Sequence, residues 1–169
     1  MKERGEKVLV CERGGTIIDA YVFVDVSIHK DNTVYAIVVI REDKLSELGR
    51  KLKWVKHRRK LGKRERRGYD SAFPRRLARI LSSGLLEKVI VVRSLDELAT
   101  LLHQLKSRYR ITAICIDNRV LAELQHHYPE VLRGVKVKPE SEVTCKKGDL
   151  RRVMLLADNL ASLTASGKL

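Results

Sequence analysis

The clearest pattern along the chain is an alternation of side chains with a period of two from Tyr21 to Ile28. One face of this segment carries only valine and isoleucine, whereas the other mixes aromatic and polar residues, which is typical of a strand between two environments. Residues 29–32 read His-Lys-Asp-Asn, which favours a turn, and Thr33 to Ile40 form an almost unbroken apolar run. The pattern predicts an antiparallel hairpin whose second strand is buried on both faces.

Helical and strand-like segments alternate after this hairpin. A helix is expected from near Asp43; Gly62 and Gly68 indicate a break, and the next helix follows Ser71 and stops at Gly84. The later elements are a buried strand at 89–92, a helix that opens with a capping box at 94–97, a strand at 111–116, a helix at 119–127, a strand at 135–137 and a helix at 149–163. Strands joined by helical crossovers pair in parallel, so the sequence predicts an α/β fold whose mixed sheet opens with an antiparallel hairpin and has helices on both faces.

The length of 169 residues is that of one domain, and we expect a single domain over 1–169. Within it, residues 1–20 are an N-terminal extension or a small hairpin, since Val8–Val10 and Thr16–Ile18 flank a Gly-Gly pair. The cysteines are odd in number and far apart, which argues against a disulfide framework or a zinc site. No apolar stretch reaches the ~20 residues of a membrane span, and the charged N-terminus lacks the core of a secretory signal. These features predict a cytoplasmic protein without membrane contact and leave its oligomeric state open.

Charge is concentrated in one stretch of the chain. Residues 50–79 hold fourteen Lys or Arg against Glu65 and Asp70, so this window carries +12 of the formal net charge of +14. A concentrated basic segment of helix and loop is typical of a protein that contacts a polyanion such as DNA or RNA. The alternative is a solvated basic helix, although such helices usually intersperse acids for pairing.

Candidate nucleic-acid contacts therefore come from the middle of this basic segment. We expect the cations to hold phosphates, and Trp54, Tyr69 and Phe73 to stack on bases, although Trp54 and Phe73 also have the spacing of core residues. The expected nucleic-acid-binding residues are Lys53, Trp54, Lys56, His57, Arg58, Arg59, Lys60, Lys63, Arg64, Arg66 and Arg67.

Three carboxylates occupy unusual positions. Asp25 interrupts an apolar strand, Asp117 ends a buried strand at the edge where parallel sheets bind ligands, and Asp158 lies beside the apolar face of the last helix. Buried carboxylates are costly unless they are paired or bind a cation, and divalent metals prefer carboxylate oxygens. If the three converge, they would repel one another and favour binding of a divalent metal ion.

Each of these acids also has a purely structural interpretation. Asp25 could lie on an exposed sheet face, Asp117 could cap the following helix, and Asp158 could pair with an arginine at 151–152. Asp149, which follows a glycine, is expected to cap the last helix and only secondarily to be a metal ligand.

Other catalytic motifs are not found in the sequence. The histidines form no HxxxH or HExxH pair, and no phosphate-binding loop of the GxxxxGK[ST] type is present. Triad hydrolysis, nucleoside triphosphate hydrolysis and dinucleotide chemistry are therefore disfavoured.

The position of the acids resembles the ribonuclease-H-like superfamily. More narrowly, Val24-Asp25-Val26-Ser27 at the start of the hairpin, Ile116-Asp117 at the middle acid and the 156–161 helix Leu-Ala-Asp-Asn-Leu-Ala resemble an uncharacterised, mobile-element-associated family in that superfamily. Members of that family begin with an Asp-Glu-Ser strand and close with a helix reading Leu-Ala-Asp-x-x-Ala. The resemblance covers roughly residues 20–165, and Val26 stands where the family often has a glutamate.

The resemblance implies a nuclease that hydrolyses phosphodiester bonds with Mg²⁺ or Mn²⁺. Asp25, Asp117 and Asp158 would be its catalytic metal ligands, with Asp25 bridging two ions. A second hypothesis is a non-catalytic DNA- or RNA-binding module on the same fold that uses residues 50–79. A third is that the basic segment docks an acidic protein.

Overall fold

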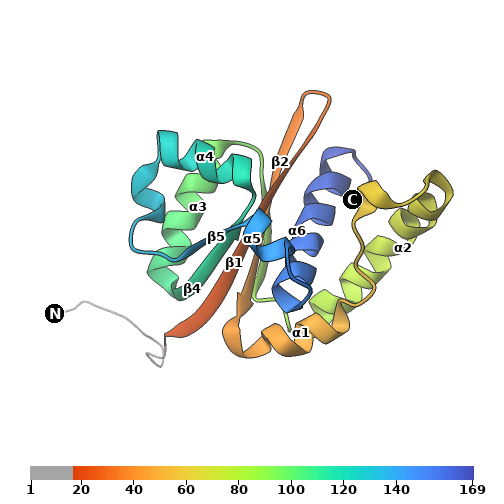
Figure 1. Ribbon diagram of the computed structural model, residues 1–169, viewed down its shortest axis with the longest axis horizontal. Coiled ribbons are helices and arrows are strands. Elements are labelled where there is room, and N and C mark those ends of the chain that lie inside the picture. The colour runs from red at the N-terminus through yellow and green to blue at the C-terminus, as the bar shows by residue number, and fades with distance from the viewer. Residues whose placement is uncertain (1–16) are drawn as a thin grey trace.

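The computed structural model describes residues 17–169, which form one five-stranded sheet with helices on both of its faces (Figure 1). The strand order is β3-β2-β1-β4-β5. β1 pairs with β2, and β2 with β3, in antiparallel fashion, whereas β1–β4 and β4–β5 are parallel. The strands are β1 (Ile18–His29), β2 (Asn32–Arg41), β3 (Lys88–Val92), β4 (Tyr109–Ile116) and β5 (Val137–Pro139). This mixed sheet and its opening hairpin confirm the predicted α/β fold class.

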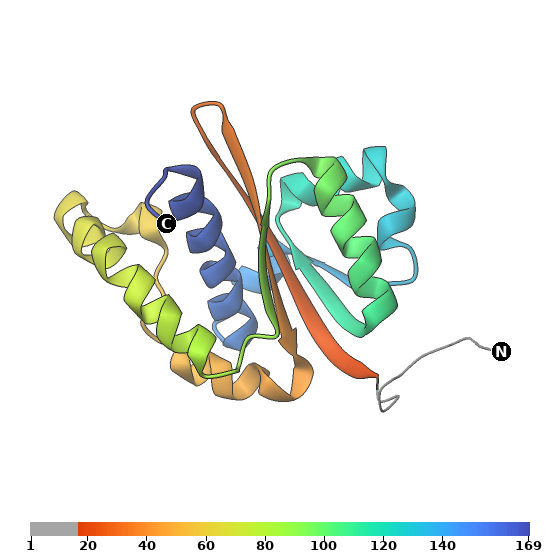
Figure 2. The ribbon, with the colours of Figure 1, turned by 180° about the vertical axis from the view of Figure 1, so that it is seen from behind.

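The helices divide between the two faces of the sheet. Figures 1 and 2 show α3 and α4 on one side and α1, α2 and α6 on the other, with the short α5 following β5. The α-helices are α1 (Leu45–Lys51), α2 (Lys63–Ser82), α3 (Leu95–Arg108), α4 (Asn118–His127), α5 (Glu140–Thr144) and α6 (Asp149–Ala165), and the 3-10 turns are η1 (Glu42–Lys44), η2 (Arg58–Lys60) and η3 (Pro129–Leu132).

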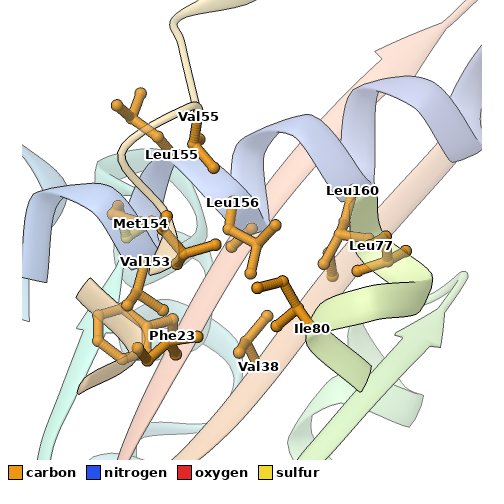
Figure 3. Packing of buried hydrophobic residues seen from close by; sticks show 14 of the residues in the cluster. Phe23, Val38, Val55, Leu77, Ile80, Val153, Met154, Leu155, Leu156 and Leu160 are labelled. Carbon is orange, nitrogen blue, oxygen red and sulfur yellow. The ribbon is translucent and has the colours of Figure 1, made fainter. Parts of the chain in front are cut away.

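The alternation in β1 produces two hydrophobic cores. Val22, Val24 and Val26 pack in the cluster that includes the apolar faces of α3 and α4. Phe23 points the other way, into the cluster formed with α2 and α6, where Figure 3 shows it beside Val153. Each fully buried side chain of this size contributes roughly 1.5–3 kcal/mol. As a result, every second residue of β1 faces α6.

Three predicted elements differ from those observed. α2 begins at Lys63 and runs without interruption through Gly68, so the predicted break at Gly68 and start after Ser71 are wrong. The helix extends further because Arg66, in its first turn, donates to the carbonyls of the preceding η2 segment. β3 is a partly exposed edge strand rather than a buried one, since it has a neighbour on one side only. The last strand, β5, lies two residues beyond its predicted position.

Other expectations are confirmed or lie outside the described residues. The Ser94 hydroxyl caps α3 by accepting from the Glu97 backbone N–H, as the capping box predicts. Gly84 follows the end of α2 with φ 76°, a conformation that favours glycine. The suggested N-terminal hairpin falls almost entirely on residues 1–16, which lie outside the described part. Between residues 17 and 169, no helix is both long enough and apolar enough to cross a membrane.

Candidate metal centre

The register of the parallel strands brings three carboxylates into one row. Val24 of β1 is level with Ile116 of β4, and Ile116 is level with Pro139 of β5. The next residue in each chain segment is acidic: Asp25, Asp117 and Glu140. One carboxylate oxygen from each lies within 4.8 Å of the other two. We call these three residues the acidic trio.

Asp25 is the most deeply buried member of the acidic trio. Its residue is 2% exposed, and it lies two positions after Phe23, on the β1 face that α6 covers. Oδ1 accepts a hydrogen bond from the Val26 backbone N–H at 2.8 Å, whereas Oδ2 is buried and has no partner among the described residues. Burial, helped by the charges of Glu140 and Asp158, raises the pKa of Asp25 to about 9. The alternative of an exposed sheet face is therefore wrong.

Asp117 caps a helix, as its sequence position suggested, and lies beside Asp25 in the acidic trio. Its backbone N–H donates to the Val24 carbonyl at 3.0 Å, which joins the end of β4 to β1. Its Oδ1 caps α4 by accepting from the backbone N–H groups of Arg119 and Val120 at 2.8 and 3.0 Å. These bonds fix the carboxylate at the edge of the sheet beside Asp25.

Glu140 is the member of the acidic trio that sequence reasoning missed. It is the first residue of α5, directly after β5, and it is half-buried. Burial, the charge of Asp117 and a hydrogen bond with Asp117 raise the pKa of Glu140 to about 7. The signal that could have found it was the rule that singled out Asp117, namely an acid directly after a parallel strand.

Asp158 lies close to the acidic trio without belonging to it. This residue of α6 is half-buried, and its charge contributes to the raised pKa of both Asp25 and Glu140. Burial raises the pKa of Asp158 itself, although the positive charges of Arg59, His57 and Arg58 act in the opposite direction. Asp158 is thus positioned between the acidic trio and the basic segment.

Asp149 is separated from this group. It lies nine residues before Asp158 on α6, about 13.5 Å along the helix axis, and contacts Arg152 at 3.6 Å. The N-cap of α6 is Gly148 and no side chain caps the helix, so the predicted cap at Asp149 is wrong. Its carboxylate lies in the first turn, where the helix dipole favours a negative charge. Of the two suggested pairing partners of Asp158, Arg152 contacts Asp149 and the Gly49 carbonyl instead, and Arg151 forms no ion pair with Asp158 in the described part of the chain.

The acidic trio could hold a metal ion. In an octahedral Mg²⁺ site with oxygens at 2.0–2.1 Å, neighbouring ligand oxygens are about 3 Å apart and opposite ones about 4 Å. Oxygens within 4.8 Å of one another therefore need only a small contraction to share one cation. Burial raises the pKa of both Asp25 and Glu140, so a bound cation would stabilise their ionised forms, and the unpartnered Oδ2 of Asp25 is an available ligand atom.

The basic segment is less available for binding than its sequence suggests. Arg58 is 7% exposed and forms a two-point ion pair with Asp70, with both N–O distances at 2.7 Å. It also donates to the Ser162 hydroxyl on α6. Its prediction as a nucleic-acid contact is therefore wrong, because Asp70 compensates the charge inside the protein.

Several other members of the segment also have structural roles. Trp54, Tyr69 and Phe73 form one aromatic cluster with centroid distances of 5.6–6.3 Å, and Arg76 stacks on Trp54 at 5.3 Å. Tyr69 and Phe73 are buried, so their predicted stacking on bases is wrong and the core interpretation holds. Half-buried positions are those of Trp54, His57 and Arg66, whereas the exposed candidates are Lys53, Lys56, Arg59, Lys60, Lys63, Arg64 and Arg67.

The architecture can be compared with the resemblance at the level of fold class alone. A five-stranded mixed sheet with this strand order and helices on both faces is compatible with a ribonuclease-H-like fold. Comparison of the chain with protein-family models and with curated proteins finds no match in either.

Proposed function

We propose that this protein is a nuclease that hydrolyses phosphodiester bonds with the help of Mg²⁺ or Mn²⁺. The observation that carries the proposal is the acidic trio, which gathers Asp117 and Glu140, at the carboxyl ends of the parallel strands β4 and β5, beside Asp25 of β1. When bound there, the cation would activate a water molecule and offset charge on the leaving oxygen.

The ligand set has different roles for its members. Asp25 is central and inflexible, because a buried strand and the Val26 N–H fix its carboxylate. Asp117 is held by the α4 cap and presents its carboxylate from the neighbouring strand. Glu140 follows β5 as the first residue of α5, and Asp158 approaches from α6 as a further candidate ligand.

Val26 stands where the family that the sequence resembles often has a glutamate, but the site does not need an acid at this position. Val26 is 8% exposed and packs in the core on the α3 and α4 side, so its side chain points away from the face of Asp25. Glu140, at the start of α5, supplies the third carboxylate instead. The acid count of the site is therefore maintained without a glutamate after Asp25.

Arg59 gives the proposed site a positively charged side chain that could contact a substrate phosphate. The η2 turn is fixed to α6 by the bond of Arg58 to Ser162, one helical turn beyond Asp158. The adjacent Arg59 is exposed, and its charge acts on both Asp158 and Glu140. An arginine beside a metal-binding carboxylate group can hold a phosphate oxygen of a nucleic-acid strand.

The test is cleavage of labelled single-stranded and duplex DNA and RNA with Mg²⁺, Mn²⁺ or EDTA. The unaltered protein is compared with Asp25→Asn and with Asp31→Asn, which makes the same change at an exposed turn. We expect cation-dependent cleavage by the unaltered protein and by Asp31→Asn, and its loss in Asp25→Asn. Equal cleavage by all three would refute the carboxylate centre. Absence of cleavage, with salt-sensitive binding intact in all three, would instead support a non-catalytic binding module.

A further inference from the structure

A groove of about 580 Å³ runs along the first half of α2, outside the acidic trio. Lys63, Arg66, Arg67, Asp70 and Ser71 line it, and they recur at helical spacings of three and four, so they form one face of α2. The opposite wall is Lys168, which follows the end of α6. Figure 2 shows the C-terminal end of the chain beside the segment that leads into α2.

The groove is positively charged despite its one carboxylate. Asp70 is held in its ionised form because the Arg58 guanidinium lowers its pKa, and Lys168 Nζ contacts it at 3.2 Å. Arg58 therefore cancels the charge of Asp70 from behind the groove, and the surplus comes from Lys63, Arg67 and their neighbours. Such a surplus in a concave surface attracts an anion.

The walls of the groove are held in place by the fold. Arg66 donates to the carbonyls of Arg58, Arg59 and Leu61, which fixes the entry to α2. The Lys168 backbone N–H donates to the Leu163 carbonyl at 2.8 Å, which closes the end of α6. The cations are thus presented from a preformed surface.

We infer that this groove binds the phosphodiester backbone of the nucleic acid, through Lys63, Arg67 and Lys168. Four of its six lining residues are cations and only one is an anion, which matches the uniform negative charge of a phosphodiester backbone. Phosphate contacts of this kind position a strand without reading its sequence.

The groove is connected to the acidic trio through α6. Arg58 joins Asp70 in the groove to Ser162, which lies four residues, or about 6 Å along the helix, beyond Asp158. A buried ion pair thus fixes the groove wall to the helix that carries Asp158. This assignment rests on the proposed function for its substrate class, but it can be tested by binding alone.

The test measures binding of labelled DNA and RNA single strands of about 20 nucleotides, long enough to cover one site. Fluorescence anisotropy in EDTA, from about 50 to 200 mM salt, gives the dependence of affinity on salt. The groove variant is Lys63→Ala/Arg67→Ala, and the control is Arg75→Ala/Arg79→Ala, an equal charge change at exposed residues of the same helix outside the groove. Lys168→Gln is the second groove variant, and circular dichroism verifies that each variant is folded.

Loss of two phosphate contacts should reduce the slope of log affinity against log salt by about 1.4 for a single strand. If the affinities converge at 1 M salt, binding at 0.1 M is then roughly 25-fold weaker. Lys168→Gln should reduce the slope by about half that amount, and the Arg75/Arg79 control should leave it unchanged. Equal losses in the groove variant and the control, or none in either, would overturn the assignment.

Three further results decide the assignment, and the last two separate it from the proposed nuclease activity. If polyglutamate of equal charge competes as well as the oligonucleotide, the groove binds an acidic protein and the assignment is wrong. If the groove variants lose affinity while the unaltered protein cleaves nothing, the groove assignment is supported and the nuclease proposal is wrong. If cleavage occurs and the groove variants bind normally, the nuclease stands and the groove assignment fails.

Discussion

The burial of Asp25 predicts an unusual dependence of stability on pH. In the metal-free folded protein this carboxyl keeps its proton up to a pKa of about 9, whereas in the unfolded chain it ionises near pH 4. The unfolded chain therefore binds fewer protons over this range, and the free energy of unfolding falls as pH rises. Between pH 5 and pH 8, three pH units at about 1.36 kcal/mol each make the loss from Asp25 about 4 kcal/mol.

Asp25→Asn should remove this loss. The amide keeps the shape of the carboxyl and can still accept from the Val26 N–H, but it does not ionise. We expect the variant and the unaltered protein to have similar stability at pH 5, and the variant to be more stable by about 4 kcal/mol at pH 8. Glu140, with its pKa of about 7, also makes the free energy of unfolding fall as pH rises, and it does so in both proteins.

Urea unfolding in EDTA at four pH values measures this effect. The single tryptophan, Trp54, packs in the aromatic cluster and reports unfolding by fluorescence. Asp31→Asn is the control and should follow the unaltered protein at every pH. Parallel pH profiles of the unaltered protein and Asp25→Asn would refute the burial of an unpaired carboxyl at this position. In a parallel experiment without EDTA, free Mn²⁺ at 100 times its Kd should stabilise the unaltered protein by about 2.7 kcal/mol and the variant by much less.

Three other substitutions test the structure around the site. Arg58→Met should reduce the free energy of unfolding by about 3–5 kcal/mol, because it leaves the buried Asp70 with Lys168 as its remaining cation among the described residues. Urea unfolding measures this change, and an unchanged midpoint would contradict the buried ion pair. Arg59→Gln should raise the pKa of Glu140 above about 7, since the guanidinium lowers it; carbon NMR titration of the carboxyl groups would show the shift, and an unchanged value would place Arg59 away from the trio. Ser94→Ala should reduce the free energy of unfolding by about 1 kcal/mol, because α3 loses its cap. Urea unfolding measures this, and Ser94→Asp, which provides another capping oxygen, should recover the lost stability.

Much of the fold could be predicted because its patterns are local. The alternation of Tyr21–Ile28 identifies a strand with two faces, and the capping box at Ser94 marks the start of α3. The break predicted at Gly68 failed because propensity is a weak signal when tertiary contacts, here those of Arg66, extend the helix.

The site was only partly predictable, because the register between strands is not local. Asp25 and Asp117 were found from their positions in or after apolar strands, but Glu140 follows a strand of three residues whose limits the sequence did not define. Charge counting also overestimated the binding surface. The sequence shows Arg58 and Asp70 twelve positions apart, and only the packing of η2 on α2 and α6 reveals that they neutralise each other.

The binding of Mn²⁺ tests the central claim most directly. Electron paramagnetic resonance of free Mn²⁺, titrated with the unaltered protein, Asp25→Asn, Glu140→Gln and the control Asp31→Asn, separates bound from unbound ion. We predict saturable binding by the unaltered protein and the control, and its loss in both Asp25→Asn and Glu140→Gln, because these residues provide two of the three oxygens that lie within 4.8 Å of one another. Equal binding by all four proteins, or by none, would contradict a metal centre at the acidic trio.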